Sequence, residues 1–333
     1  MVRRNRDENQ LLGRIAQAFA GKRGRGDRAL RLGIGDDAAL YVPRSGYESV
    51  LTCDWFLEGT HFLRKQHPAD AIGWKCLARA VSDVAAMGGI PRCFLLSLAL
   101  PPSHTGKWLG QFLGGLRRAS RRFRCVLAGG DTTRQEKILI NVSVVGEVRA
   151  GRAILRSGAR PGDLIYVSGR LGEAELGLRL LRSGKVKTDD KDPYVKKHLY
   201  PEPRLVLGQW LSEKCVASAM MDLSDGLSSD LPRLCAASGV GARIEETKLP
   251  VVKLPARFAR GGVDPLKLAL DGGDDYELLF TVPKGKARLV PGSLEGVRLT
   301  KIGEVTRKKK IILGQAGGLT RQLMPRGWDP FRR

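Results

Sequence analysis

The stretch Met220-Met221-Asp222-Leu223-Ser224-Asp225-Gly226 decides the fold class, because it joins two kinds of secondary structure. Its first four residues end an apolar, strand-like run. Ser224 to Gly226 then open an amphipathic segment that continues toward Ala237. Short apolar runs alternate with longer helical patterns on both sides of this joint. The alternation predicts an α/β (α+β) protein.

The alternation extends over the whole chain of 333 residues, a length that suits two domains. Helical patterns are expected at residues 11–19, 68–87, 108–122 and 173–182, and strand-like runs at residues 49–53, 93–100, 125–128, 138–148, 164–167 and 276–282. Residues 149–163 are rich in Gly, Arg and Pro. We therefore expect domains at residues 1–148 and 149–333.

Charge is strongly unbalanced, with 57 Lys and Arg against 34 Asp and Glu and a formal net charge of +23. Such a chain attracts polyanions. The charge gathers at residues 22–31, 117–124 and 307–310, and it is interpreted mainly as solvated surface. No zinc-finger, RNP or homeodomain pattern accompanies it, which argues against nucleic-acid binding as the main function.

The six cysteines form no CxxC pair and lie mostly in apolar stretches. This usage is typical of reduced, buried thiols and predicts a cytoplasmic protein. The N-terminal residues contain no apolar segment of the kind found in signal peptides. No run of 18 apolar residues occurs, so no membrane-spanning helix is expected.

Five segments deliver an aspartate from an apolar run or a tight glycine turn. They are Gly35-Asp36-Asp37, Thr52-Cys53-Asp54, Gly129-Gly130-Asp131, Asp222-Leu223-Ser224-Asp225 and Gly272-Gly273-Asp274-Asp275. Any one of them could simply cap a turn or a helix. Five together indicate a site for a hard cation such as Mg²⁺ and for phosphate oxygens, since carboxylates at strand ends suit both.

Asp83 lies near the C-terminal end of its predicted helix, where the helix dipole disfavours a negative charge by about 0.3–1 kcal/mol. A bound cation would offset this cost, and so would a salt bridge with Arg79 one turn earlier. Nucleotide use is not proved by these residues. The chain lacks a Walker A motif and the protein-kinase motif set, which excludes two familiar classes of ATP-binding protein.

Taken together, the segments closely resemble thiamine-monophosphate kinase, of the superfamily that includes aminoimidazole ribonucleotide synthetase. The resemblance is carried, in the family's order and over nearly the whole chain, by GIGDDAAL, TCDWFLEGTHF, SDVAAMGG, AGGDTTR, GRAILRSGARPGD, MDLSDGLSSDL, GGDDYEL and GWDPF. Each motif is weak alone, and eight in order are highly specific.

The resemblance implies that ATP directly phosphorylates thiamine monophosphate to thiamine diphosphate, with several Mg²⁺ ions as cofactors. It implies a two-domain fold in which each domain is a mixed sheet covered by helices. The first domain would bind ATP and Mg²⁺ and pair through its sheet into a homodimer. The second would complete the active site. Neither a membrane nor a nucleic acid is expected as a partner.

The resemblance also implies residue roles, without a covalent nucleophile. The metal ligands would be Asp37, Thr52, Cys53, Asp54, Asp83, Asp131, Asp222 and Asp225; the ATP contacts Gly130, Arg156 and Ser224; and the substrate contacts His61, Asp274 and Trp328. Ordinary structural roles remain open for three of these residues. His61 could be a structural histidine, Trp328 a packed tail residue, and Arg156 a solvated loop charge.

Two positions depart from the family pattern. Cys53 replaces the usual hydroxyl residue, which weakens a metal site if the side chain is the ligand but not if the backbone carbonyl is. Asp274 replaces the usual Glu and is one methylene shorter. Its substrate contact could therefore pass through a water or to Asp275.

Two other functions compete with this hypothesis. One is another ATP-dependent enzyme of the superfamily, although selenophosphate synthetase should have a reactive Cys or Sec in its N-terminal segment, and no Cys precedes Cys53. The other is a non-catalytic, nucleic-acid-binding relative, suggested by the +23 charge. The acidic motif positions, all kept except Asp274, argue against that loss of catalysis.

Overall fold

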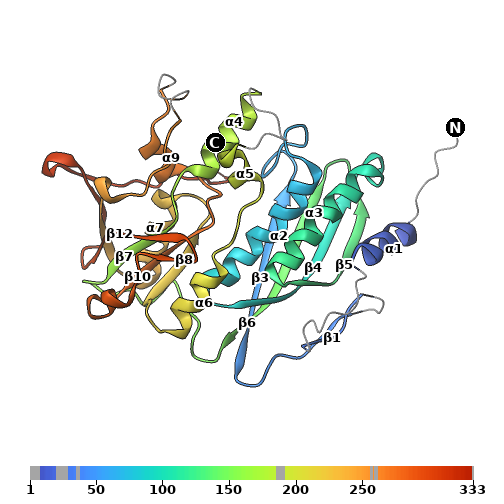
Figure 1. Cartoon of the computed structure of the whole chain (residues 1–333), viewed down its shortest axis with the longest axis horizontal. Helices are drawn as coiled ribbons and strands as arrows, with labels where there is room; N and C mark the ends of the chain where they lie inside the picture. The colour runs from blue at the N-terminus through green and yellow to red at the C-terminus, as the bar shows by residue number, and fades with distance from the viewer. Residues whose placement is uncertain are drawn as a thin grey trace. The chain divides into compact units, whose positions relative to one another are not determined.

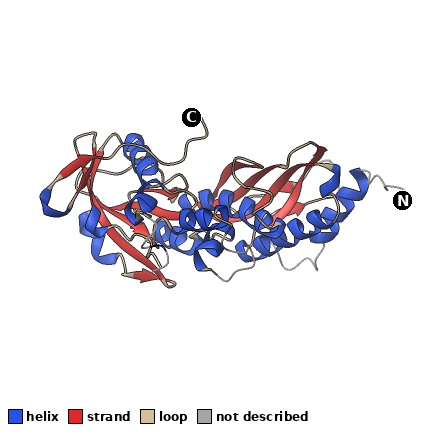
Figure 2. Cartoon of the chain, turned by 90° about the horizontal axis from the view of Figure 1, so that it is seen from above, coloured by secondary structure: helices blue, strands red, loops and turns tan. Residues whose placement is uncertain are grey.

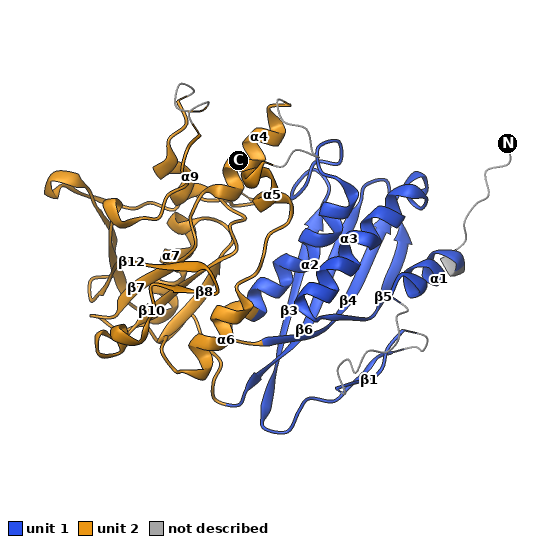
Figure 3. Cartoon of the chain, in the orientation of Figure 1, with its two compact units in different colours: residues 1–84, 90–150 blue, residues 85–89, 151–333 orange. Residues whose placement is uncertain are grey.

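The computed structural model describes residues 8–19, 29–34, 38–184, 192–255, 258 and 262–331. The chain forms two compact units (Figure 3): unit 1 comprises residues 1–84 and 90–150, and unit 2 comprises residues 85–89 and 151–333. The expected metal ligand Asp37 lies outside the described residues.

Unit 1 is built mainly from two long helices and a four-stranded sheet (Figure 1). Its elements are α1 (Glu8–Phe19), β1 (Leu30–Leu32), β2 (Leu40–Tyr41), β3 (Tyr47–Leu57), α2 (Ala69–Ala86), β4 (Ile90–Leu100), the 3₁₀ turn η1 (Pro102–His104), α3 (Lys107–Phe123), β5 (Val126–Arg134) and β6 (Leu139–Arg149). The last residues of α2 belong to unit 2.

The strand order in the main sheet of unit 1 is β3-β6-β4-β5. The β4–β5 pair is parallel and the other two pairs are antiparallel, so the sheet is mixed. Helices cover one face of this sheet, as Figure 2 shows. On the other face, Leu51 and Trp55 are 73% and 55% exposed. The described part of the chain thus leaves an apolar sheet face uncovered.

Helices α2 and α3 pack closely because glycines lie where they meet. A Cβ on Gly73 of α2 would collide with the Phe112 carbonyl, and one on Gly115 of α3 would collide with the Asp70 carbonyl. The apolar residues of α3 recur every three or four positions and are buried, namely Leu109, Phe112, Leu113, Leu116, Ala119 and Phe123. This packing fixes α2 behind the sheet, and with it Asp83.

The strands of unit 1 are longer than predicted, and this changes the position of two aspartates. β3 continues to Leu57 and β5 to Arg134. Asp54 and Asp131 therefore lie within strands and not at strand ends, so the sequence-based interpretation was wrong on this point. The cause in β5 is its pairing with β4, which carries the strand through Gly129 and Gly130 to Asp131 and beyond.

Unit 2 contains a larger mixed sheet of eight strands. Its elements are β7 (Leu164–Ser168), α4 (Glu173–Arg182), α5 (Pro193–Leu199), α6 (Leu205–Glu213), β8 (Ala219–Leu223), α7 (Leu227–Ser238), β9 (Gly241–Glu245), η2 (Glu246–Lys248), α9 (Pro265–Asp271), β10 (Glu277–Val282), η3 (Lys284–Leu289), β11 (Ser293–Leu294), β12 (Val297–Thr306), β13 (Ile311–Gly314), η4 (Ala316–Gly318) and β14 (Thr320–Gln322). The order is β14-β13-β9-β12-β7-β10-β8, with β11 paired to β12.

The sheet of unit 2 is buried on both faces at its centre. All six residues of β10 are buried. Leu279 belongs to one core cluster, while Leu278 and Phe280 belong to the other. Alternation along the strand thus supplies two cores, as expected for a sheet between helix layers. Both units are mixed sheets with helices, which confirms the predicted α/β class. Within the described residues, none of the helices has the length and apolar character needed to cross a membrane.

Candidate active site

In unit 1, strand β3 and helix α2 bring three of the expected metal ligands together. The Thr52 hydroxyl donates a 2.5 Å hydrogen bond to Asp83 Oδ2. Asp54, two residues further along β3, points to the same face of the strand, and its Oδ2 lies 3.9 Å from Arg79 Nε. Thr52, Asp54 and Asp83 therefore form an acidic group beside the Arg79 guanidinium.

Cys53 points away from this group, because side chains alternate along a strand. Its thiol contacts Asn141, with Asn141 Nδ2 3.1 Å from Sγ. The Asn141 amide also donates to the Asp54 carbonyl at 3.2 Å. The Cys53 thiol therefore faces away from the acidic group, and of the two routes to a metal that the sequence left open, this orientation favours the backbone carbonyl.

His61 is held in a fixed orientation after β3. Its Nδ1 accepts a 3.0 Å hydrogen bond from the Leu57 N–H, and its ring stacks near Phe56 with centroids 6.0 Å apart. Because Nδ1 accepts, the neutral ring carries its proton on Nε2. His61 is therefore oriented to offer a donor.

Gly130 and Asp131 lie at the other edge of the sheet. Asp54 of β3 pairs with Val142 of β6. Val142 pairs with Leu96 of β4, which in turn pairs with Gly130 of β5, so Asp54 and Gly130 lie at the two ends of one row across the sheet. Three strand spacings separate the two positions, or about 14 Å. A side chain on Gly130 would collide with the Leu96 carbonyl. Within unit 1, the sheet therefore does not bring Asp131 to the group around Asp54.

In unit 2, backbone hydrogen bonds join three of the predicted segments. The Asp274 N–H donates to the Ser224 carbonyl at 2.8 Å, and the Trp328 N–H donates to the Asp225 carbonyl at 2.9 Å. A Cβ on Gly327 would collide with the same Asp225 carbonyl. The loop after β8, the loop before β10 and the C-terminal segment thus meet at one place. Asp222, the penultimate residue of β8, precedes the first of these loops and is buried.

Sequence reasoning missed two residues of α7 that hold the loop after β8. Asp230 accepts hydrogen bonds from three consecutive N–H groups of that loop, and Arg233 contacts the carboxylates of both Asp225 and Asp230. Burial, and then the neighbouring Asp225 charge, raise the pKa of Asp230 to about 6. An aspartate in the first turn of the predicted helix was the available signal.

Asp274 has a left-handed backbone, with φ 67°, and accepts a 2.7 Å hydrogen bond from the Tyr276 hydroxyl. Its Oδ2 lies 3.9 Å from His198 Nδ1. Asp275 has a different role, since its carboxylate accepts the N–H groups of Gly172 and Ala174 at the start of α4. Burial raises the pKa of Asp275 to about 7. Its position as a buried helix cap does not support a transfer of the substrate contact to Asp275.

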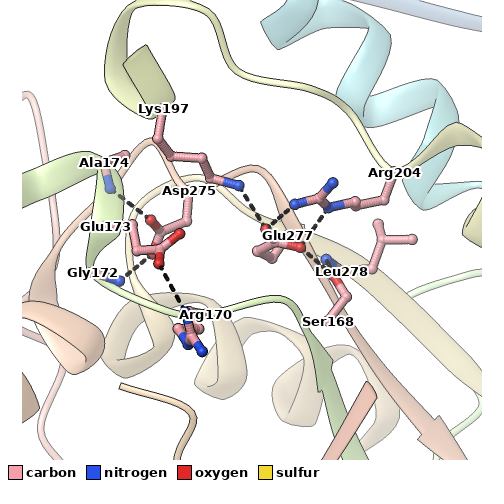
Figure 4. A network of polar contacts seen from close by, with 10 residues as sticks. All are labelled: Ser168, Arg170, Gly172, Glu173, Ala174, Lys197, Arg204, Asp275, Glu277 and Leu278. Carbon is pink, nitrogen blue, oxygen red and sulfur yellow. Dashed lines mark hydrogen bonds and ion pairs between the residues drawn. The ribbon is translucent and has the colours of Figure 1, made fainter. Parts of the chain in front are cut away.

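Glu277, two residues further along, is the centre of a buried polar network (Figure 4). Its carboxylate accepts from Lys197 Nζ at 2.7 Å, Arg204 Nε at 2.6 Å and Ser168 Oγ at 2.5 Å. Burial alone would raise its pKa, but the two cations outweigh burial and lower the pKa to about 2. This network and the Asp275 cap together fix the start of β10 and the loop before it, which carries Asp274.

Arg156 lies at the opposite end of α7 from Ser224. Its carbonyl accepts a 2.9 Å hydrogen bond from Ser238 Oγ at the last residue of that helix. A helix of 12 residues spans about 18 Å. Within unit 2, the structure does not bring Arg156 to Ser224.

Within the described part of the chain, no three His, Cys, Asp or Glu side chains gather as a ready metal site. The donors fit Mg²⁺ in kind, because they are carboxylate and hydroxyl oxygens. The residues of the acidic group in unit 1, and Asp222 and Asp225 in unit 2, are fewer than the six ligands of Mg²⁺, which leaves coordination positions for phosphate oxygens and water.

Comparison with known families matches both halves of the chain. The domain described as "AIR synthase related protein, N-terminal domain" matches residues 35–148, and "AIR synthase related protein, C-terminal domain" matches residues 160–314. The thiamine-monophosphate kinase of Salmonella typhimurium is 40% identical over 279 residues, which cover 82% of this chain and 84% of that protein.

Two solved structures are similar over nearly their whole length. The thiamine-monophosphate kinase from Stenotrophomonas maltophilia has a TM-score of 0.80 and 34% identity, covering 92% of this chain and 96% of that one. The structure described as "AaThiL complexed with AMPPCP and TMP" has a TM-score of 0.76 and 35% identity, covering 96% of both chains.

Proposed function

The chain belongs to the AIR synthase related proteins and, within them, to the thiamine-monophosphate kinases, and on this premise we propose that it transfers the γ-phosphoryl group of ATP to thiamine monophosphate. The products are thiamine diphosphate and ADP. The related AaThiL binds AMPPCP and TMP, so both substrate classes have a counterpart in a relative of the same fold.

One observation carries this proposal. Backbone hydrogen bonds join the loops that present Ser224, Asp225, Asp274 and Trp328, although these residues are far apart in sequence. The residues that we propose to contact the phosphates and the thiamine rings therefore come from neighbouring loops of unit 2. A solvated surface or a set of unrelated helix caps would not need this convergence.

Mg²⁺ is the cation that we propose for the acidic groups. Thr52, Asp54 and Asp83 would hold it in unit 1, and Asp222 and Asp225 in unit 2, with Asp37 and Asp131 as further ligands. When bound, Mg²⁺ screens the repulsion between two phosphorylated substrates and neutralises charge in the transition state. The aspartates fix where that positive charge lies.

The other residues bind and orient the substrates. Trp328, with 45% of its surface exposed, offers an aromatic face to the thiamine rings, and Asp274 offers a carboxylate with a fixed backbone. His61 would donate from Nε2 to the substrate phosphate, while Gly130, Ser224 and Arg156 would contact ATP. The substrate phosphate oxygen is the attacking atom, so the protein needs no covalent nucleophile.

We further propose a homodimer formed through the sheet of unit 1. The uncovered face around Leu51 and Trp55 is apolar, and the edge strands β3 and β5 each have one neighbour among the described strands. A second copy would cover the face and pair the edges, which isolated proteins rarely leave open. If β3 pairs with the partner's β5, that strand also comes beside Asp54. Four of the six cysteines are buried thiols outside any disulfide, as suits a cytoplasmic protein.

The experiment that tests the function is a product assay with purified chain, ATP, Mg²⁺ and thiamine monophosphate. Thiamine diphosphate and ADP should form in equal amounts. ADP release that depends instead on an aminoimidazole precursor would assign the chain to another branch of the superfamily.

A further inference from the structure

The loop between β8 and α7 is shaped by a residue from inside the helix that follows it. The Asp230 side chain is fully buried, and its Oδ2 lies 3.1, 3.0 and 3.1 Å from the backbone nitrogens of Ser224, Asp225 and Gly226. Gly226, at the N-cap of α7, has no side chain to cap the helix. One carboxylate oxygen thus gathers three consecutive N–H groups, which fixes the curve of the loop.

The other oxygen of Asp230 is bound by Arg233, one turn later. Arg233 Nη1 donates to Asp230 Oδ1 at 2.8 Å and also to Asp225 Oδ2. The Arg233 side chain is 46% exposed, whereas that of Asp225 is 23% exposed. The partly exposed Arg233 guanidinium therefore bridges the buried carboxylate of Asp230 and the more exposed carboxylate of Asp225.

From these contacts we propose that Asp230 is a positioning residue for the Ser224–Gly226 loop and that Arg233 is a built-in counter-ion of Asp225, which a bound divalent cation must displace or share. The inference rests on the proposed function only in taking Asp225 as a cation ligand. Without a cation, Arg233 neutralises Asp225 and keeps it in place.

The two residues should respond differently to the cation. Asp230 bonds to the backbone and keeps those bonds in either state. Arg233 holds an oxygen that the cation needs, and its positive charge repels a cation placed beside it. Arg233 therefore stabilises the cation-free protein and weakens cation binding.

Arg233→Gln tests the counter-ion role through stability, without ATP or thiamine monophosphate. The variant should melt at a lower temperature in EDTA and should reach half of its Mg²⁺-induced stabilisation at a roughly three- to tenfold lower Mg²⁺ concentration. The matched control is Arg243→Gln, which removes a surface pair with Glu245 in the same unit. Unchanged or weaker Mg²⁺ binding in Arg233→Gln, or no Mg²⁺ effect on the unmodified chain, would overturn this role.

Hydrogen exchange tests the role of Asp230. The amides of Ser224, Asp225 and Gly226 should exchange faster in Asp230→Ala, while Asp230→Asn, which keeps an acceptor oxygen, should retain part of the protection. Unchanged exchange at these amides in a folded Asp230→Ala protein would overturn it. Both experiments omit ATP and thiamine monophosphate. Their results can therefore contradict this inference while the product assay confirms the kinase activity, or support it while the product assay detects no activity.

Discussion

Asp54 and Asp131 occupy neighbouring rows of one four-stranded sheet, but they lie on its two opposite edge strands, β3 and β5. The two edge strands are three strand spacings apart, or about 14 Å. Mg²⁺ binds its ligands at 2.0–2.1 Å, so one ion cannot contact both aspartates of the same protomer. If both act on the same cation, a second copy must supply one of them.

A mixing experiment tests this sharing. Asp54→Asn and Asp131→Asn should each reduce turnover roughly 10²–10³-fold, because each removes a carboxylate from the proposed cation site. When the two variants are unfolded, mixed equally and refolded, half of the proposed dimers would contain one chain of each variant and therefore one intact site. Turnover should then return to about one quarter of the unmodified value. The control variant is Asp70→Asn, which removes a surface salt bridge with Arg118 and should remain active. Failure of the mixture to regain activity would contradict a shared site.

Cys53 should tolerate replacement by a hydroxyl residue. Its thiol lies on Asn141, on the face of β3 opposite Thr52 and Asp54. Cys53→Ser should therefore change the Mg²⁺ concentration for half-maximal turnover by no more than about twofold. Thr52→Ala, which removes the hydroxyl bonded to Asp83, should raise that concentration clearly. A large change in this Mg²⁺ concentration in Cys53→Ser, without one in Thr52→Ala, would indicate that the thiol takes part in metal binding.

Trp328 should contribute to affinity for thiamine monophosphate. If its ring stacks on the substrate, Trp328→Ala should raise the KM for this substrate roughly tenfold to hundredfold, from about 1–3 kcal/mol of stacking. Trp328→Phe should keep most of the affinity, and the KM for ATP should stay unchanged. The neighbouring Phe331, 94% exposed, provides the control variant Phe331→Ala. Equal KM values for Trp328→Ala and the unmodified chain would leave the tryptophan with a structural role only.

Glu277 should matter for stability and for its dependence on pH. Its pKa is lowered from 4.5 to about 2, so it contributes stability that is present above pH 4.5 and is lost as the pH falls toward 2. Asp275 acts in the opposite sense. Its pKa is raised from 3.8 to about 7, so its stabilising effect is complete below pH 3.8 and is lost as the pH rises through 7.

Glu277→Gln leaves Lys197 and Arg204 without their carboxylate and should cost about 3–5 kcal/mol at neutral pH. The variant should also lose less stability between pH 4.5 and 2 than the unmodified chain. Denaturant unfolding at several pH values measures both effects. Glu304→Gln, which removes an exposed pair with Lys284, should cost at most about 1 kcal/mol. A similar small loss in Glu277→Gln would show that the network is not a stabilising one.

Local patterns were enough to predict several of the longer elements, but not β9, β12 or β13 of unit 2. Helix α2 was expected at residues 68–87 and spans Ala69–Ala86, since its apolar residues recur at helical spacing and a glycine pair ends it. The joint at residues 220–226 likewise forms a strand and then a helix. Motif order also predicted the family correctly.

The arrangement of the site depended on contacts that no local pattern contains. The strand order that separates Asp54 from Asp131 is set by pairing between segments far apart in sequence. Pairing also carried β5 through two glycines that were expected to end it. Arg156 and Ser224 are separated by the length of α7, which motif matching does not measure.

The most direct test of the central claim follows the phosphoryl group itself. The purified chain is incubated with Mg²⁺, thiamine monophosphate and ATP labelled in its γ-phosphate, and the labelled products are separated. The label should appear in thiamine diphosphate, one for each ADP formed, and only when thiamine monophosphate is present. Label released as free phosphate, or ADP formed only with an aminoimidazole precursor, would contradict the assignment as a thiamine-monophosphate kinase.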